Sequence, residues 1–94
     1  MAVSEYFSKW YHNNTQVEFS RNFAESNNVD TVYYRLTLIR PPERVVFNMK
    51  KNRNGHWEID DRTHLDPTVI DMEPDFVKAI KENEYTESFS YREI

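Results

Sequence analysis

Apolar and polar residues alternate most clearly between Glu43 and Asp60. A period of two places one set of side chains on a buried face of a β-sheet and the other set in water. The pattern therefore predicts a β-hairpin over residues 43–60. Its inward-facing residues are Val45, Phe47, Met49, Trp57 and Ile59.

The turn of this hairpin has to keep apolar residues opposite apolar residues. A two-residue loop at Asn54-Gly55 would place Met49 opposite Asp60, which sets the core face against the solvent face. A three-residue loop over Arg53, Asn54 and Gly55 avoids this conflict and leaves Gly55 in the left-handed conformation. Gly55 is the one glycine of the chain, which supports this assignment.

Two earlier segments, Thr15 to Phe23 and Asp30 to Ile39, alternate in the same way and predict strands joined by a polar loop over residues 24–29. Pro41 and Pro42 place the next turn at the sheet rim, because proline cannot donate to a strand ladder. An even-length loop over residues 40–43 keeps the inward faces together. The register that follows pairs Leu36 with Phe47, Tyr34 with Met49, Arg35 with Asn48 and Tyr33 with Lys50.

Helices are predicted toward the two ends of the chain. Residues Ala2 to Asn13 carry an apolar stripe at helical spacing. The stripe consists of Val3, Phe7, Trp10 and Tyr11. A second helix is expected to begin near Pro74 and to reach about Glu84, because proline suits a first helical turn. Before it, Asp66-Pro67 predicts a turn, and the pattern leaves open whether residues 68–72 form a short extra strand.

The resulting fold class is α+β, with the element order αββββα. It is a four-stranded antiparallel meander with two helices on one face. Residues 1–85 are expected to form a single domain, and residues 86–94 a C-terminal tail or an added edge strand. Strand 15–23 is expected at the sheet edge. Edge pairing through that strand or the tail would produce a homodimer.

Charge is unevenly divided along the chain. The net charge is −4, but residues 1–53 carry 8 Lys and Arg against 5 Asp and Glu, whereas residues 54–94 carry 4 against 11. The chain has no cysteine, which excludes a disulfide framework. No apolar run is long enough to span a membrane. The expected compartment is the cytoplasm.

The outward face of the predicted sheet is the candidate partner-binding site. Its residues are Tyr33, Arg35, Val46, Asn48 and Lys50. Tyrosine and arginine often anchor interfaces, and the cations favour an acidic partner, so a protein-binding module is expected. The alternative is a solvated strand face on which Tyr33 and Val46 pack across neighbouring strands and bind nothing.

Single-stranded nucleic acid is the second candidate partner, because aromatic and basic residues on a sheet stack on bases and hold phosphates. The residues from Phe47 to Gly55 resemble the first hairpin of PUR-type nucleic-acid-binding repeats. This resemblance covers one hairpin, and the helix and two strands expected before it depart from that family's order. The acidic second half of the chain also repels phosphate.

A small-ligand or enzymatic role is the third candidate function. A four-stranded sheet with a helix across it resembles cystatin-like and NTF2-like architectures, whose curved sheets enclose ligands. His56, Glu58 and Asp60 share the outward side of one strand, a spacing that suits metal binding or acid–base chemistry. His64 and Asp66 join them only if the 61–66 loop folds back. An exposed polar strand is the commoner meaning of this pattern, so no catalytic residue, metal or cofactor is predicted.

Overall fold

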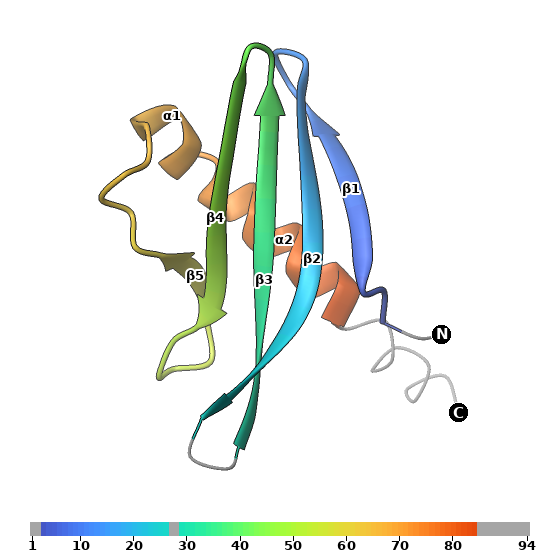
Figure 1. Cartoon of the computed structure of the whole chain (residues 1–94), viewed down its shortest axis with the longest axis vertical. Coiled ribbons are helices and arrows are strands. Elements are labelled where there is room, and N and C mark those ends of the chain that lie inside the picture. The colour runs from blue at the N-terminus through green and yellow to red at the C-terminus, as the bar shows by residue number, and fades with distance from the viewer. Residues whose placement is uncertain (1–2, 27–28, 85–94) are drawn as a thin grey trace.

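The protein forms a five-stranded antiparallel sheet covered on one face by helix (Figure 1). The computed structural model describes residues 3–26 and 29–84. The strands are β1 (Tyr6–Tyr11), β2 (Thr15–Ser26), β3 (Val29–Arg40), β4 (Glu43–Lys51) and β5 (Trp57–Asp60), and the helices are α1 (Pro67–Ile70) and α2 (Glu73–Glu84). Each strand pairs with its neighbour in the sequence. The α+β class and the meander are therefore confirmed, but the strand count of four and the order αββββα are wrong.

The main correction concerns the first predicted helix, because residues 6–11 form β1. Phe7 and Tyr11 pack against the core, whereas Trp10 lies exposed on the opposite face. Trp10 faces outward and its neighbour Tyr11 faces inward, so the sequence of this strand shows the same apolar spacing as one side of a helix. Asn13 and Asn14 do adopt positive φ, 59° and 54°, but in the turn between β1 and β2 rather than at a helix end.

The next two strands are longer than predicted. β2 continues to Ser26 and β3 begins at Val29, so most of the expected loop over residues 24–29 belongs to strands. Strand β2 is also not an edge strand, because β1 pairs with its other side from Tyr6 to Tyr11. The edge strands are β1 and β5.

Both turn predictions gave the correct register. Arg40 pairs with Glu43, so the turn itself is only Pro41-Pro42, yet all four predicted pairs between β3 and β4 are present. At the second turn, Asn52 donates its backbone N–H to the His56 carbonyl at 2.8 Å. Gly55 has a φ of +81°, the left-handed conformation that the three-residue loop requires.

Residues 67–70 form helix α1, which excludes the short extra strand that the sequence left open over residues 68–72. The Asp66 side chain accepts a hydrogen bond of 3.0 Å from the Thr68 backbone N–H, and Pro67 occupies the first turn. Both are helix-starting features, since an N-cap carboxylate satisfies a free N–H and proline needs no donor there. Val69 then turns inward and is buried.

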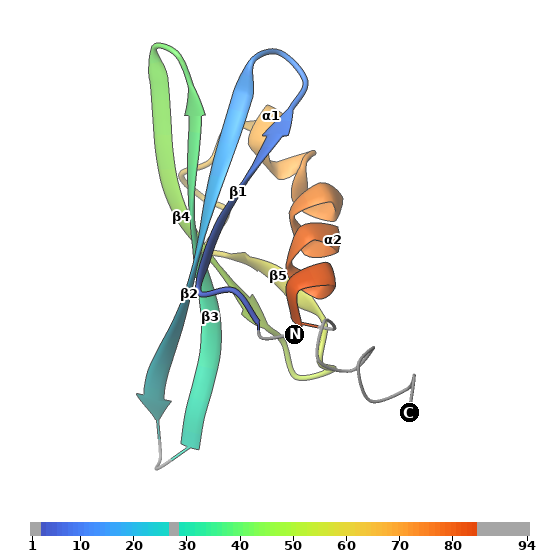
Figure 2. The ribbon, with the colours of Figure 1, turned by 90° about the vertical axis from the view of Figure 1, so that its right-hand side faces the viewer.

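Helix α2 confirms the second predicted helix and closes the core. It crosses the face of the sheet that carries the inward residues (Figure 2). Phe76 is fully buried, with ring centroids 5.5 Å from Phe47 and 6.5 Å from Phe19. Trp57 is also buried, as predicted. The predicted tail over residues 86–94 lies outside the described residues.

Candidate functional site

The five predicted partner-binding residues lie together on the outer face, defined here as the face of the sheet opposite α2 (Figure 2). β3 contributes two of them and β4 three, and the strand register sets Tyr33 beside Lys50 and Arg35 beside Asn48. Arg35, Val46 and Lys50 are exposed, while Tyr33 and Asn48 are half-buried by their neighbours. No described helix or loop covers the centre of this face.

Acidic side chains interrupt the basic character of the outer face. Lys50 Nζ lies 3.2 Å from Asp60 Oδ1, and Glu58 sits opposite Lys50 on β5. Glu18 lies on the same face of β2, next to Thr37 of β3. The face therefore presents alternating charges, and the predicted basic surface is weaker than the sequence of β3 and β4 alone implies.

Strand β1 extends the outer face with two aromatic residues that the sequence analysis assigned to a helix. Trp10 is 66% exposed and Tyr6 is 60% exposed. A hydrogen bond with Glu18 raises the pKa of Tyr6. Tyr6 also opens a row that crosses all five strands through Ser20, Arg35, Asn48 and Asp60. The β-propensity of the tyrosine- and tryptophan-rich segment 6–11 was the available signal for this strand.

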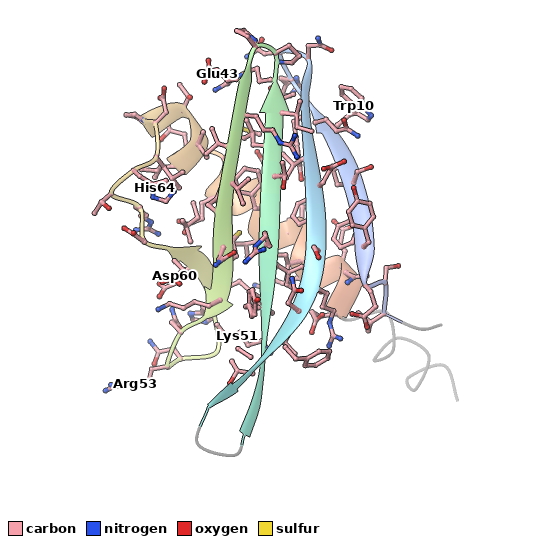
Figure 3. The ribbon with its side chains drawn as sticks, viewed as in Figure 1. Trp10, Glu43, Lys51, Arg53, Asp60 and His64 are labelled. Atoms are coloured by element: carbon pink, nitrogen blue, oxygen red, sulfur yellow. The ribbon has the colours of Figure 1, made fainter. Side chains whose placement is uncertain are left out.

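The loop after β5 forms one wall of a shallow recess in the outer face. The recess has a volume of about 330 Å³ and is lined by Arg35, Val46, Phe47, Asn48, Asp60, Asp61 and His64. Asp60 and His64 stand beside the lower and upper parts of this loop in Figure 3. Asp61 turns the chain with a φ of 60°. Hydrogen bonds from the Thr63 hydroxyl and backbone N–H hold the pKa of Asp61 below its ordinary value. The recess is large enough to receive a side chain of a partner.

The acid–base candidates do not assemble into a metal centre. Over residues 3–26 and 29–84, no three His, Asp or Glu side chains come close enough to share a metal ion. His56 and Glu58 are absent from the walls of the recess above, although Asp60 and His64 are present there. Asp66 is occupied as the N-cap of α1.

A wider groove runs along the other side of the molecule, between β5 and α2. Its volume is about 630 Å³, and its walls include Trp57, Glu73, Val77 and Lys81. Glu73 is not free to act there. Its carboxylate accepts the Ile59 backbone N–H at 2.8 Å and the Arg62 guanidinium at 2.7 Å. These bonds give Glu73 a structural role in joining α2 to β5.

Comparisons with protein-family models, with curated proteins and with solved structures return no match for this chain. Among the described residues, neither helix has the length and apolar character needed to cross a membrane. The function must therefore be argued from the geometry of the chain itself.

Proposed function

We propose that this protein is a small binding module that engages a protein partner through the outer face. The observation that carries the proposal is the position of Arg35 and Val46 on the sheet. They are diagonal neighbours on β3 and β4, since Arg35 pairs with Asn48 and Thr37 pairs with Val46, and both line the recess of about 330 Å³. Val46 is 48% exposed, and a solvated strand position needs no such apolar side chain. Arginine beside an apolar residue at a hollow is typical of an interface anchor.

Alternating charge favours a protein over a nucleic acid as that partner. Lys50 is paired with Asp60, and Glu58 stands next to it on β5. A phosphate backbone running across the sheet would meet these carboxylates as well as the cations, and each repels it. A protein surface of mixed charge matches such a pattern, since complementarity is set residue by residue.

A double charge reversal, Arg35→Glu with Lys50→Glu, tests the proposal. The matched control is Lys78→Glu with Lys81→Glu, which makes the same change in net charge on helix α2, on the opposite side of the sheet. Circular dichroism first establishes that both variants are folded. Partners recovered from a lysate of the native host by the unchanged protein should also be recovered by the α2 variant, and lost by the outer-face variant.

A photo-crosslinking residue placed at Val46 locates the contact directly, with Val77 on α2 as the control position. Crosslinks from position 46 alone would support the outer face. Recovery of the same partners by the outer-face variant would place the site elsewhere. Loss of oligonucleotide binding in that variant, with unchanged protein partners, would favour a nucleic-acid function instead.

A further inference from the structure

The free edge of strand β1 has a self-complementary pattern of hydrogen-bonding groups. The Arg21 backbone N–H donates to the Glu5 carbonyl at 2.8 Å, in line with the register of β1 and β2. In an antiparallel ladder, such hydrogen-bonded pairs recur at every second residue. The odd-numbered residues of β1 therefore face β2, and the backbone groups of Tyr6, Ser8 and Trp10 point away from the sheet.

A side chain caps the opposite edge of the sheet, whereas none of the described residues caps the outward N–H groups of β1. On β5, the outward N–H of Ile59 donates to the Glu73 carboxylate at 2.8 Å. The outward N–H groups of β1 have no such acceptor within the described part of the chain. Strand β1 also lacks proline, and its six consecutive pairs with β2 contain no bulge. An unbroken edge of this kind is a template for another strand.

We propose that β1 pairs antiparallel with β1 of a second copy of this chain, about a two-fold axis at Ser8. In this register Ser8 faces Ser8 of the second copy, and Tyr6 faces Trp10. All three outward residues then form hydrogen-bonded pairs, because their positions are symmetric about residue 8. The contact uses the same surface on both copies, so it closes as a dimer and joins the two sheets into one of ten strands.

The exposed side chains on the outer face of β1 fit the same register. On the outer face, the two exposed aromatic residues, Tyr6 and Trp10, become direct cross-strand neighbours, twice over by symmetry. Aromatic cross-strand pairs stabilise antiparallel strands. On the inner face, Lys9 faces Phe7 of the second copy, with Glu5 of that copy at one diagonal position and Lys9 at the other, so charge there does not select the register.

The size of the contact indicates a reversible dimer. A fully covered tyrosine or tryptophan buries roughly 150–250 Å², so the four aromatic side chains, each now more than half exposed, supply on the order of 500 Å². The paired backbones add to this, toward the lower limit of about 1,200 Å² for specific interfaces. This inference does not depend on the proposed function, since β1 contributes none of the five residues assigned there.

Sedimentation of the full chain over a range of concentrations tests the dimer. The unchanged protein should shift from monomer to dimer as concentration rises. Ser8→Pro should remain monomeric, because it removes an outward N–H without breaking the ladder to β2. Ser8→Thr keeps that N–H and should dimerise normally. A monomer at all concentrations, or an unchanged dimer in folded Ser8→Pro, would overturn the proposal.

Side-chain variants provide a test that does not alter the backbone. Tyr6→Ser with Trp10→Ser should raise the dimer dissociation constant at least about tenfold, because both symmetric aromatic pairs are lost. The control is Phe23→Ser, which removes a residue that is 57% exposed and lies beyond the part of β2 that pairs with β1. Equal effects of the two changes would contradict the assigned surface.

Spin labels test the register itself, since the chain has no native cysteine. Ser8→Cys carries a label at the proposed axis, where the two Cα atoms would be about 5.5 Å apart. Its spectrum should be broadened by dipolar coupling in the dimer, unlike that of a label at Phe23→Cys.

A chain ending at Glu84 should dimerise as the full chain does. A dimer that needs residues 85–94, or that shows no broadening at position 8, would exclude β1 pairing.

Discussion

The Glu84 carboxylate accepts a hydrogen bond of 2.8 Å from Nε of Arg21, which ties the last turn of α2 to strand β2. The same carboxylate oxygen accepts the Tyr34 hydroxyl hydrogen. Asn83 donates to that hydroxyl at 2.8 Å and also bonds to the backbone of Ser4. This polar cluster therefore joins the end of α2 to β2, to β3 and to the segment just before β1.

Removing the Glu84 carboxylate should destabilise the protein strongly. Both side chains of the Arg21–Glu84 pair are about 85% buried, with exposures of 15% and 16%. Glu84→Ala leaves the guanidinium without its closest acceptor, so we expect a loss of about 2–4 kcal/mol in the free energy of unfolding. Glu84→Gln keeps an acceptor for Tyr34 and should lose less. Denaturant unfolding measures both, and a loss below about 1 kcal/mol in Glu84→Ala would mean that the hydrogen bonds at Glu84 contribute little.

Glu73 should make the stability of the protein fall in acid. Partial burial raises its pKa, but hydrogen bonds from Arg62 and from the Ile59 N–H outweigh this and hold the pKa below the ordinary value of 4.5. A carboxylate with a lowered pKa in the folded state contributes stability that is present above its unfolded pKa and lost as pH falls through the folded value.

The Glu73→Gln variant should therefore lose less unfolding free energy than the unchanged protein as the pH falls from about 6 to about 3. At neutral pH it should already be the less stable of the two, because the charged hydrogen bonds are gone. Arg62→Gln should flatten the same acid dependence. Parallel pH curves for the unchanged protein and Glu73→Gln would contradict the assignment.

The two tryptophans form a matched pair for testing which face is the core. Trp57 is 6% exposed, and its ring lies edge-on to Tyr34 at a centroid distance of 5.3 Å. Trp57→Ala should cost about 3–5 kcal/mol of unfolding free energy, the usual range for a buried aromatic residue. Trp10→Ala, measured at concentrations where the protein is monomeric, should cost under about 1 kcal/mol. A small loss at Trp57 would mean that the inner face is wrongly assigned.

Gly55 should tolerate asparagine better than valine. Its φ of +81° is unfavourable for a β-branched residue, while no atom beyond its two chain neighbours lies within 4 Å of where a Cβ would stand. The penalty for Gly55→Val is therefore conformational, and we expect more than about 1 kcal/mol. Gly55→Asn should lose less, because asparagine enters the left-handed region more readily. Thermal unfolding of both variants checks the order, and a neutral Gly55→Val would contradict the turn.

Strand register could be predicted from sequence because it follows from which residues share a face and from the length of each turn. Placing Leu38 and Val45 on one face leaves only even-length turns, and the single glycine at residue 55 selects an odd one. The pairs between β3 and β4 then follow without any knowledge of the rest of the molecule. The grouping of Arg35, Val46 and Asn48 on one face was available for the same reason.

Strand β1 and helix α1 were harder because their patterns are short. Six residues with aromatic side chains on both faces leave the alternation of β1 unreadable, since the exposed Trp10 and the half-buried Tyr11 differ only in position. The N-cap signal at Asp66 was present but lay in a four-residue helix. The ion pair between Lys50 and Asp60 was not predicted, because the two residues lie on different strands.

The meander has a consequence for how the chain acquires its structure during synthesis. Every strand pairs with the one made just before it, so the pairing of each hairpin needs no part of the chain that is synthesised later. The apolar inner face has no cover until α2 follows, and its end reaches back 79 residues from Asn83 to Ser4. Until that last contact closes, the nascent sheet presents its apolar side to the cell, the condition in which chaperones bind.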